Sequence, residues 1–379
     1  MMKKVGIVGV GQTTFERRKE DTFDELVFEV VTKALADAGG EIGDIDNIVT
    51  VSNDFWDGRT ISSMGIQDAA GSWDKDISTV EGDGSFGVLY GMMRAMSGSF
   101  ETSLVVSHMK GSEAVMNLIT NAIFDPIYQR SLGIDATSSA ALQARVYMEK
   151  AKATQEDFAL ASVKNHKNAK NNPHAQLPMD ISVEDVMKSK MLADPLKLLD
   201  CSPISDGAAA VVIATEKGAK RFKKSPVWIK GVGHISDAYT LGYRDLASTR
   251  ALDAAAKKAY KTAGVKNPLK DLDVVELYDA YSYMEPLWYE GLGLAKEGKG
   301  VELLRSGETA MDGSLPVNPS GGVISAHPVL VAGIARIIEG VLQLRGEAEK
   351  RQVKGAKTAL AHGINGACGQ SHCVFVMGV

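Results

Sequence analysis

Residues 80–97 read VEGDGSFGVLYGMMRAMS and combine three structural signals within a short distance. An apolar strand ends where the stretch begins, closely spaced glycines allow a tight turn, and an apolar-periodic helix begins near Phe86. Such a helix start leaves backbone N–H groups facing a pocket. Reactive residues are usually mounted on turns of this kind, yet the apex offers only Asp83, Gly84 and Ser85.

Apolar strands and helical segments alternate on both sides of this turn, which predicts an α/β protein. The pattern occurs twice. Helical DELVFEVVTKALADAG (residues 24–39) precedes the strand region DIDNIVTVSND (44–54), and ALDAAAKKAYKTAG (251–264) precedes DLDVVELYDA (271–280). Each helix stops at Ala-Gly, and each copy is followed by a glycine turn that opens another helix. If a pseudo-twofold axis relates the copies, the two glycine turns share one pocket.

The boundaries follow from this repeat. We predict an N-terminal half at residues 1–220 and a C-terminal half at residues 221–379, divided at a charged linker. The segment at about 111–194 interrupts the regular alternation. We interpret it as an insertion that caps the pocket or makes subunit contacts.

Composition narrows the class of partner. The chain has 379 residues, a formal net charge of −5 and no extended basic cluster, so we expect no nucleic-acid partner. No apolar run approaches the length of a membrane span, and three cysteines cannot form a complete disulfide framework. We therefore expect no membrane insertion and a cytoplasmic location.

The second glycine turn, GGVISAHP at residues 321–328, carries the catalytic candidate His327. Its glycines, including Gly322, allow close backbone approach, and a proline follows the histidine near a helix start. A neutral imidazole at this place can act as a base or as an oxyanion donor. A histidine that only caps a helix is the alternative, but the double glycine and the symmetry with the first turn favour the catalytic interpretation.

The strand that ends in VVELYDAYSY places aromatic hydroxyls where α/β proteins bind ligands. Tyr278 can donate a hydrogen bond to a thioester or ketone oxygen, and Asp279 can cap the next helix. Core packing is the alternative for such a tyrosine cluster. Upstream, Ser202 in DCSPISDG can bind a polar ligand or cap a turn, while a structural role is favoured for Cys201.

The C-terminal segment AHGINGACGQSHC (residues 361–373) contains a glycine loop with Gly366 and Cys368. Cys368 is the thiol expected to be accessible, and Cys373 is expected in the core. The two histidines and two cysteines of this segment are residue types that commonly bind zinc. We predict no metal in this chain, because no second CxxC-like pair exists and the residues around Cys373 alternate faces of a strand.

Taken in order, these motifs resemble the thiolase superfamily across essentially the whole chain, and most closely its archaeal and sterol-carrier-protein-like members. The resemblance implies a five-layer α/β/α/β/α fold of two pseudo-twofold-related halves, a homodimer core, and chemistry at a carbon–carbon bond β to a coenzyme A thioester. It also implies that His327 is similar to the family's GHP histidine. Ser202 falls where many members contact coenzyme A, and Tyr278 replaces an asparagine or histidine that helps hold the thioester oxygen.

The chain departs from the family at the first turn, where the nucleophilic cysteine falls on Gly84. We expect Gly84 to offer its backbone N–H to an oxyanion and to enlarge the pocket for a branched or aromatic acyl group. The family's second cysteine falls near His362 or Gly363, which leaves Cys368 as a displaced acid/base candidate. We assign coenzyme A or substrate binding to Ser202, Ser85, Gly322, Gly366 and Tyr243.

The chain resembles the superfamily members that lack this cysteine, which are thiolase-type subunits of two-component enzymes that degrade benzylsuccinate-type aromatics and steroid side chains. The resemblance implies a small zinc-ribbon/OB-fold partner that carries any zinc, with coenzyme A as a substrate and no tightly bound cofactor in this chain. We favour cleavage of a bulky β-ketoacyl-CoA such as benzoylsuccinyl-CoA. The alternatives are a retro-aldolase acting on a β-hydroxyacyl-CoA, and a non-catalytic acyl-CoA-binding scaffold.

Overall fold

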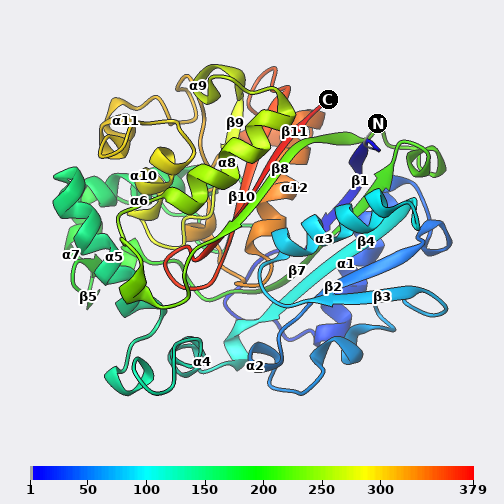
Figure 1. Cartoon of the computed structure of the whole chain (residues 1–379), viewed down its shortest axis with the longest axis horizontal. Helices are drawn as coiled ribbons and strands as arrows, with labels where there is room; N and C mark the ends of the chain where they lie inside the picture. Colours follow the sequence, from blue (N-terminus) through cyan, green and yellow to red (C-terminus); the bar gives the residue numbers. More distant parts are fainter. Residues whose placement is uncertain (1–2) are drawn as a thin grey trace.

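The computed structural model describes residues 3–379. Within them one continuous sheet runs in the order β3-β2-β4-β7-β1-β8-β11-β10-β9 (Figure 1). Its strands are β1 (Val5–Gln12), β2 (Asn47–Val51), β3 (Asp76–Val80), β4 (Thr102–Lys110), β7 (Asp206–Thr215), β8 (Val227–Ser236), β9 (Val274–Glu276), β10 (Thr358–Asn365) and β11 (Ser371–Gly378).

The sheet has two parts that correspond to the two copies in the sequence. β2 pairs in parallel with β3 and β4, and β9 pairs in parallel with β10, as expected after helical crossovers. The parts join where β1 meets β8 through the residue pairs Gly6–Trp228 and Ile7–Val227. Most of these strands are buried along their whole length, which explains their nearly continuous apolar sequences.

Helices cover both faces of each part and build five layers. The helices concerned are α1 (Phe23–Ala38), α3 (Gly84–Ser97), α8 (Arg250–Ala263) and α12 (Ala332–Arg345). α1 packs on β1 and β7, and α8 packs on β8 and β11. α3 and α12 contact each other between the two parts, α3 against β4 and α12 against β10. The predicted α/β/α/β/α arrangement is confirmed.

The repeat is also visible in how the helices end. α1 stops at Gly39 and α8 at Gly264, and both glycines have a positive φ, of 68° and 79°. Only glycine adopts this left-handed conformation at little cost, so the Ala-Gly pairs are helix C-caps as predicted. The expected domain division near residue 220 stays a prediction.

The segment at about 111–194 is mainly helical and lies to one side of the strands of the C-terminal half (Figure 1). Its elements are α4 (Met116–Ala122), α5 (Ala136–Ala151), α6 (Gln155–Ala169), α7 (Val183–Lys188) and β5 (Met191–Ala193), which pairs with β6 (Leu196–Lys197). The remaining helices are α2 (Asp54–Asp57), α9 (Pro268–Asp271), α10 (Met284–Gly291) and α11 (Gly300–Ser306). Across residues 3–379, no helix has the length and apolar character that a membrane crossing requires.

Candidate active site

A cavity of about 1080 Å³ lies where the two glycine turns meet. Gly82 and Asp83 line it from the first turn, and His327 and Leu330 line it from the second. The prediction that both turns share one pocket is confirmed. The insertion also reaches the cavity and contributes the apolar side chains Met116, Ile123, Leu177, Met179 and Leu192.

His327 is held by hydrogen bonds at both ring nitrogens. Its Nδ1 lies 2.8 Å from Ser202 Oγ, and its Nε2 lies 2.7 Å from the Tyr278 hydroxyl. The backbone N–H of His327 donates to Ser205 Oγ at 2.8 Å. His327, Ser202 and Tyr278 all line the cavity, so the structure brings these three predicted residues together.

Burial sets the protonation of this array. Burial, aided by the charge of Arg336, lowers the pKa of His327 to about 3, and burial raises the pKa of Tyr278. At neutral pH the imidazole and the phenol are therefore both uncharged. Either tautomer of His327 satisfies both contacts. In the tautomer with the proton on Nδ1, the imidazole donates to Ser202 and His327 Nε2 accepts the proton of the Tyr278 hydroxyl.

Asp83 connects the two glycine turns. One carboxylate oxygen accepts the Ser85 N–H at 3.0 Å and caps α3, and the other accepts the Gly333 N–H at 2.7 Å at the start of α12. Burial raises the pKa of Asp83 to about 6, against the opposing effect of these hydrogen bonds and that of the Ser85 hydroxyl. A single carboxylate thus lies at two helix N-termini, where the helix dipoles favour negative charge.

The expectations for Gly84 are wrong. Its N–H donates to the Leu330 carbonyl at 2.7 Å, so it is not free to bind an oxyanion. A Cβ at this position would lie 2.7 Å from Ile334 Cγ2, against α12, and Gly84 does not line the cavity. The missing side chain therefore allows α3 and α12 to approach closely and does not enlarge the pocket.

The C-terminal loop lines the cavity with Gly366 and Cys368, as predicted, but the accessibility expected of the thiol is wrong. Cys368 is 7% exposed, and its Sγ donates to the Ser139 carbonyl at 3.2 Å. Burial raises its pKa to about 11, while Ser139 and Arg244 oppose the shift. Cys201 also lines the cavity, and burial raises its pKa too, so neither thiol is a ready thiolate.

The two histidines of the C-terminal segment form a buried pair outside the cavity. His362 Nε2 lies 2.9 Å from His372 Nδ1, and the rings stack beside Trp288. Burial lowers the pKa of both histidines. Among residues 3–379, no group of three or more histidine, cysteine or acidic side chains could hold a metal ion. Cys373 lies in the core, as expected.

Three predicted binding residues do not reach the cavity. Ser85 is buried and bonded to Asp83, and Tyr243 is 83% exposed on the surface. Gly322 has a φ of 68° and packs against Asp279, whose Oδ1 would lie 2.4 Å from an added Cβ. Gly322 therefore shapes the turn that carries His327.

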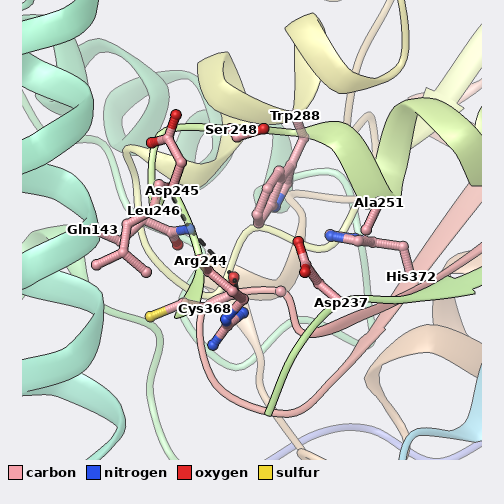
Figure 2. A pocket seen from close by; sticks show the side chains of 11 residues that line it. Gln143, Asp237, Arg244, Asp245, Leu246, Ser248, Ala251, Trp288, Cys368 and His372 are labelled. Atoms are coloured by element: carbon pink, nitrogen blue, oxygen red, sulfur yellow. Dashed lines mark hydrogen bonds between the residues drawn. The ribbon is translucent and has the colours of Figure 1, made fainter. Parts of the chain in front are cut away.

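Sequence reasoning missed the link made by Asp83 and the lining contributed by the insertion. The Asp-Gly-Ser order before α3 is a helix N-cap signal that identifies Asp83 as a cap, but not its second bond to Gly333. No motif marks the apolar insertion residues. Also missed was a small polar pocket behind the C-terminal loop, shown in Figure 2, where Arg244 and Gln143 approach Cys368.

The whole chain can be compared with known proteins. The family descriptions "Thiolase, N-terminal domain" and "Thiolase C-terminal domain-like" match residues 5–217 and 233–379. An acetyl-CoA acetyltransferase of Methanothermobacter thermautotrophicus is 38% identical, over 97% of this chain and 98% of its own length. The benzoylsuccinyl-CoA thiolase subunit BbsB of Thauera aromatica is 30% identical, over 97% of this chain and 96% of its own.

Among solved structures, the Ltp2-ChsH2(DUF35) aldolase superposes with a TM-score of 0.86 and 26% identity, and the match covers 99% of this chain and 98% of that one. Sequence and structure thus agree over both halves. The chain belongs to the thiolase superfamily.

Proposed function

We propose that this chain cleaves or forms a carbon–carbon bond β to a coenzyme A thioester without a covalent acyl-enzyme, as in the retro-aldol cleavage of a β-hydroxyacyl-CoA. The observation that carries the proposal is a complete proton-transfer array, Ser202–His327–Tyr278, in a cavity with no ready thiolate. Aldol chemistry requires a base and stabilisation of an enolate, but no nucleophile.

The array supports one balanced sequence of steps. The substrate β-hydroxyl gives its proton to the Tyr278 oxygen while Tyr278 passes its own proton to His327 Nε2. The Cα–Cβ bond then breaks, its electron pair forms the thioester enolate, and the β-carbon becomes the carbonyl of a released aldehyde or ketone. The proton held by His327 returns through Tyr278 to Cα, which completes a shorter acyl-CoA.

The negative enolate would stabilise the transient imidazolium, which burial otherwise disfavours. Ser202 accepts the Nδ1 proton and so keeps Nε2 directed at Tyr278. We infer that Ser202 positions the imidazole for this reaction and that Tyr278 transfers the proton. Gly366 and Cys368, from the same cavity wall, are proposed to contact the acyl group or the pantetheine thioester.

The size of the cavity supports a bulky acyl group. A volume of about 1080 Å³ exceeds the need of an acetyl unit, and drug-sized ligands occupy pockets of roughly 300–1,000 Å³. The insertion adds large apolar side chains to the wall, which suit an aromatic or polycyclic group, beside the polar residues Asn117, Thr120, Asp135, Thr137 and His166.

A second subunit is part of the proposal. The structural relative pairs Ltp2 with ChsH2, a DUF35 protein, and the relative BbsB is itself a subunit. Large apolar side chains are exposed along the insertion of this chain, namely Val115, Leu118, Ile127, Tyr128 and Leu132. Exposed apolar groups of this size are typical of interaction sites. The zinc-ribbon/OB-fold nature of the partner, the homodimer and the cytoplasmic location stay predictions.

Thiolytic cleavage of a bulky β-ketoacyl-CoA is the second candidate, favoured by the similarity to BbsB over nearly the whole chain. In this reaction His327 would deprotonate the thiol of incoming coenzyme A through Tyr278, and the thiolate would attack the ketone directly. The adduct would then collapse to the new thioester as the Cα–Cβ bond breaks, and the released enolate would take the proton from His327 through Tyr278. Both reactions use the same array and differ in whether coenzyme A is consumed.

Product analysis separates the candidates. The purified protein is incubated with a β-hydroxyacyl-CoA and with the β-ketoacyl-CoA of the same aromatic acyl group, with and without coenzyme A, and products are identified by liquid chromatography and mass spectrometry. We expect a free carbonyl compound and a shorter acyl-CoA from the hydroxy ester without added coenzyme A. Cleavage of the keto ester alone, with strict dependence on coenzyme A, would establish the thiolase reaction instead. Binding of both esters without turnover, even with a partner subunit present, would support the scaffold.

A further inference from the structure

The C-terminal loop at residues 366–369 has a backbone that needs external support. Gly366, Cys368 and Gly369 all have positive φ values, of 81°, 54° and 65°. For the non-glycine Cys368 this conformation is strained, and such strain persists only where surrounding contacts hold it. The loop forms one wall of the cavity, so whatever holds it also shapes the site.

Arg244 supplies two of the hydrogen bonds that support the loop. Its guanidinium donates to the Ala367 carbonyl at 3.0 Å and to the Cys368 carbonyl at 3.4 Å. Gln143 donates a further bond to the Cys368 carbonyl at 3.2 Å, and the Asp237 N–H donates to the Gln370 carbonyl at 2.7 Å. Successive carbonyls of the loop are thus turned away from the cavity, toward the polar pocket of Figure 2.

Arg244 also acts on the thiol electrostatically. Its charge is one of the two influences that oppose the effect of burial on the pKa of Cys368. In Figure 2 the guanidinium lies against the loop, with Asp237 on the same side of the pocket. An Arg at this place combines a fixed fork of donors with a permanent charge, which a lysine cannot reproduce.

We propose that Arg244 is a positioning residue of the active site, which clamps the left-handed loop at residues 366–369 so that Cys368 is held in the cavity wall against Ser139. The consequence for the reaction rests on the proposed function, since the loop is assigned to the acyl or thioester group. The clamp itself can be tested without any turnover.

The first test measures the alkylation rate of Cys368 by iodoacetamide, by peptide mass spectrometry, in the full chain. We expect Arg244→Ala to accelerate it about tenfold or more, the effect of losing charge-assisted hydrogen bonds. Loss of the Arg244 charge alone would raise the pKa of the thiol and slow its alkylation. Faster alkylation would therefore come from loss of the hydrogen bonds that hold the loop. Cys373, fully buried in β11, must stay unreactive and reports that the fold is intact.

The second test is chemical rescue. Arg244→Ala enlarges the polar pocket, and a few millimolar guanidinium should bind there and restore both slow alkylation of Cys368 and turnover. In Arg244→Lys the alkylation rate of Cys368 should lie between those of the wild type and Arg244→Ala, and guanidinium should not change it. This variant replaces Arg244→Ala in the test if Arg244→Ala does not fold. The matched control is Arg18→Ala, which removes an exposed arginine paired with the exposed Glu20.

The proposal would be overturned if alkylation of Cys368 in both Arg244 variants were no faster than in the wild type and Arg18→Ala. A complete lack of rescue by guanidinium would also overturn it. Faster, rescuable alkylation with unchanged turnover would confirm the clamp and remove the loop from the proposed reaction. The two claims therefore fail separately.

Discussion

The two glycine turns that open α3 and α12 are related by the internal repeat, lie at the same cavity, and differ in chemistry. The first turn is closed, because Asp83 accepts the Ser85 N–H and the Leu330 carbonyl accepts the Gly84 N–H. Asp83 also accepts the Gly333 N–H at the start of α12. The second presents His327 to the cavity between Ser202 and Tyr278. The first turn therefore organises the protein's centre, and the second carries its proton chemistry.

This difference explains why the first turn can lack a nucleophile without loss of the fold. The Asp83 carboxylate lies at two helix N-termini and accepts backbone N–H groups that an open turn would direct at a substrate. Substitutions in the first turn should change stability, and substitutions around His327 should change turnover. The predictions below test that separation.

The largest effect is expected from His327→Ala. Removing the base should lower kcat/KM for carbon–carbon bond cleavage by about 10²–10⁴, the usual contribution of general acid–base catalysis. Unfolding in urea should stay cooperative. His234→Ala, an exposed histidine on β8, is the control and should keep full activity. Turnover within threefold of the wild type would mean that the second turn is not the chemical one.

Gly84→Cys restores the family's cysteine, and we expect it to fail as a nucleophile. The new Cβ would collide with Ile334 and approach the Leu330 carbonyl, so the free energy of unfolding should fall by about 1–3 kcal/mol, the usual effect of overpacking. Gly43→Cys, at an exposed glycine with open space around its Cβ position, controls for the added thiol. An acyl adduct on the introduced thiol together with faster thiolysis would show that the first turn can carry chemistry, and would contradict its assignment as purely structural.

Asp83→Asn tests the link between the two turns. The Asn side-chain NH2 would face one of the two backbone N–H groups that Asp83 now accepts. This clash of two donors should lower the free energy of unfolding by about 1–2 kcal/mol at pH 7. Because the pKa of Asp83 is raised to about 6 in the folded state, the folded protein takes up this proton before the unfolded chain does as the pH falls. Asp83 therefore contributes stability below its unfolded pKa of about 3.9, and this contribution is lost as the pH rises through 6.

The measurement is urea unfolding of the wild type and Asp83→Asn at several pH values between 4 and 7, since the difference cancels all other groups. We expect the advantage of the wild type to grow toward pH 4. If the stability advantage of the wild type over Asp83→Asn shrinks toward pH 4, the pKa of Asp83 is lowered on folding, as in an ordinary ion pair. That result would contradict the placement of a buried Asp83 carboxylate between the two helices. Asp76→Asn, on the exposed edge of β3, is the control.

Ser202→Ala should have the smallest effect. It removes the acceptor of the Nδ1 proton and leaves Tyr278 in place, so turnover should fall by about tenfold, as expected for one hydrogen bond of ordinary strength. The pH dependence of kcat should change as well, because the imidazole is no longer held in one tautomer. A shift in KM alone, with kcat and its pH profile unchanged, would make Ser202 a binding residue only.

The sequence predicted the fold because its signals are local and repeated. Helix stops at Gly39 and Gly264 and the glycine turns before α3 and α12 are readable from a few residues each. His327 and Tyr278 are predicted for the same reason, since His327 lies in a glycine turn and Tyr278 follows a strand. The coenzyme A contact of Ser202 is predicted from the resemblance to the family.

The rest of the site depends on packing between distant segments. A side chain at Gly84 would meet the Leu330 carbonyl, just before α12, and Ile334 of α12, both far along the chain. The Cys368 Sγ donates to the Ser139 carbonyl of the insertion, and Arg244 donates to the carbonyl of the preceding Ala367. No short pattern encodes such contacts.

The central claim is that the bond is cleaved without a covalent intermediate, and intact-protein mass spectrometry tests it most directly. The protein is mixed with excess substrate acyl-CoA and quenched in acid during turnover, and its mass is compared with that of untreated protein. The account predicts an unmodified mass while product accumulates. An acyl mass on Cys368 or Cys201 that forms and decays at the rate of turnover would contradict it.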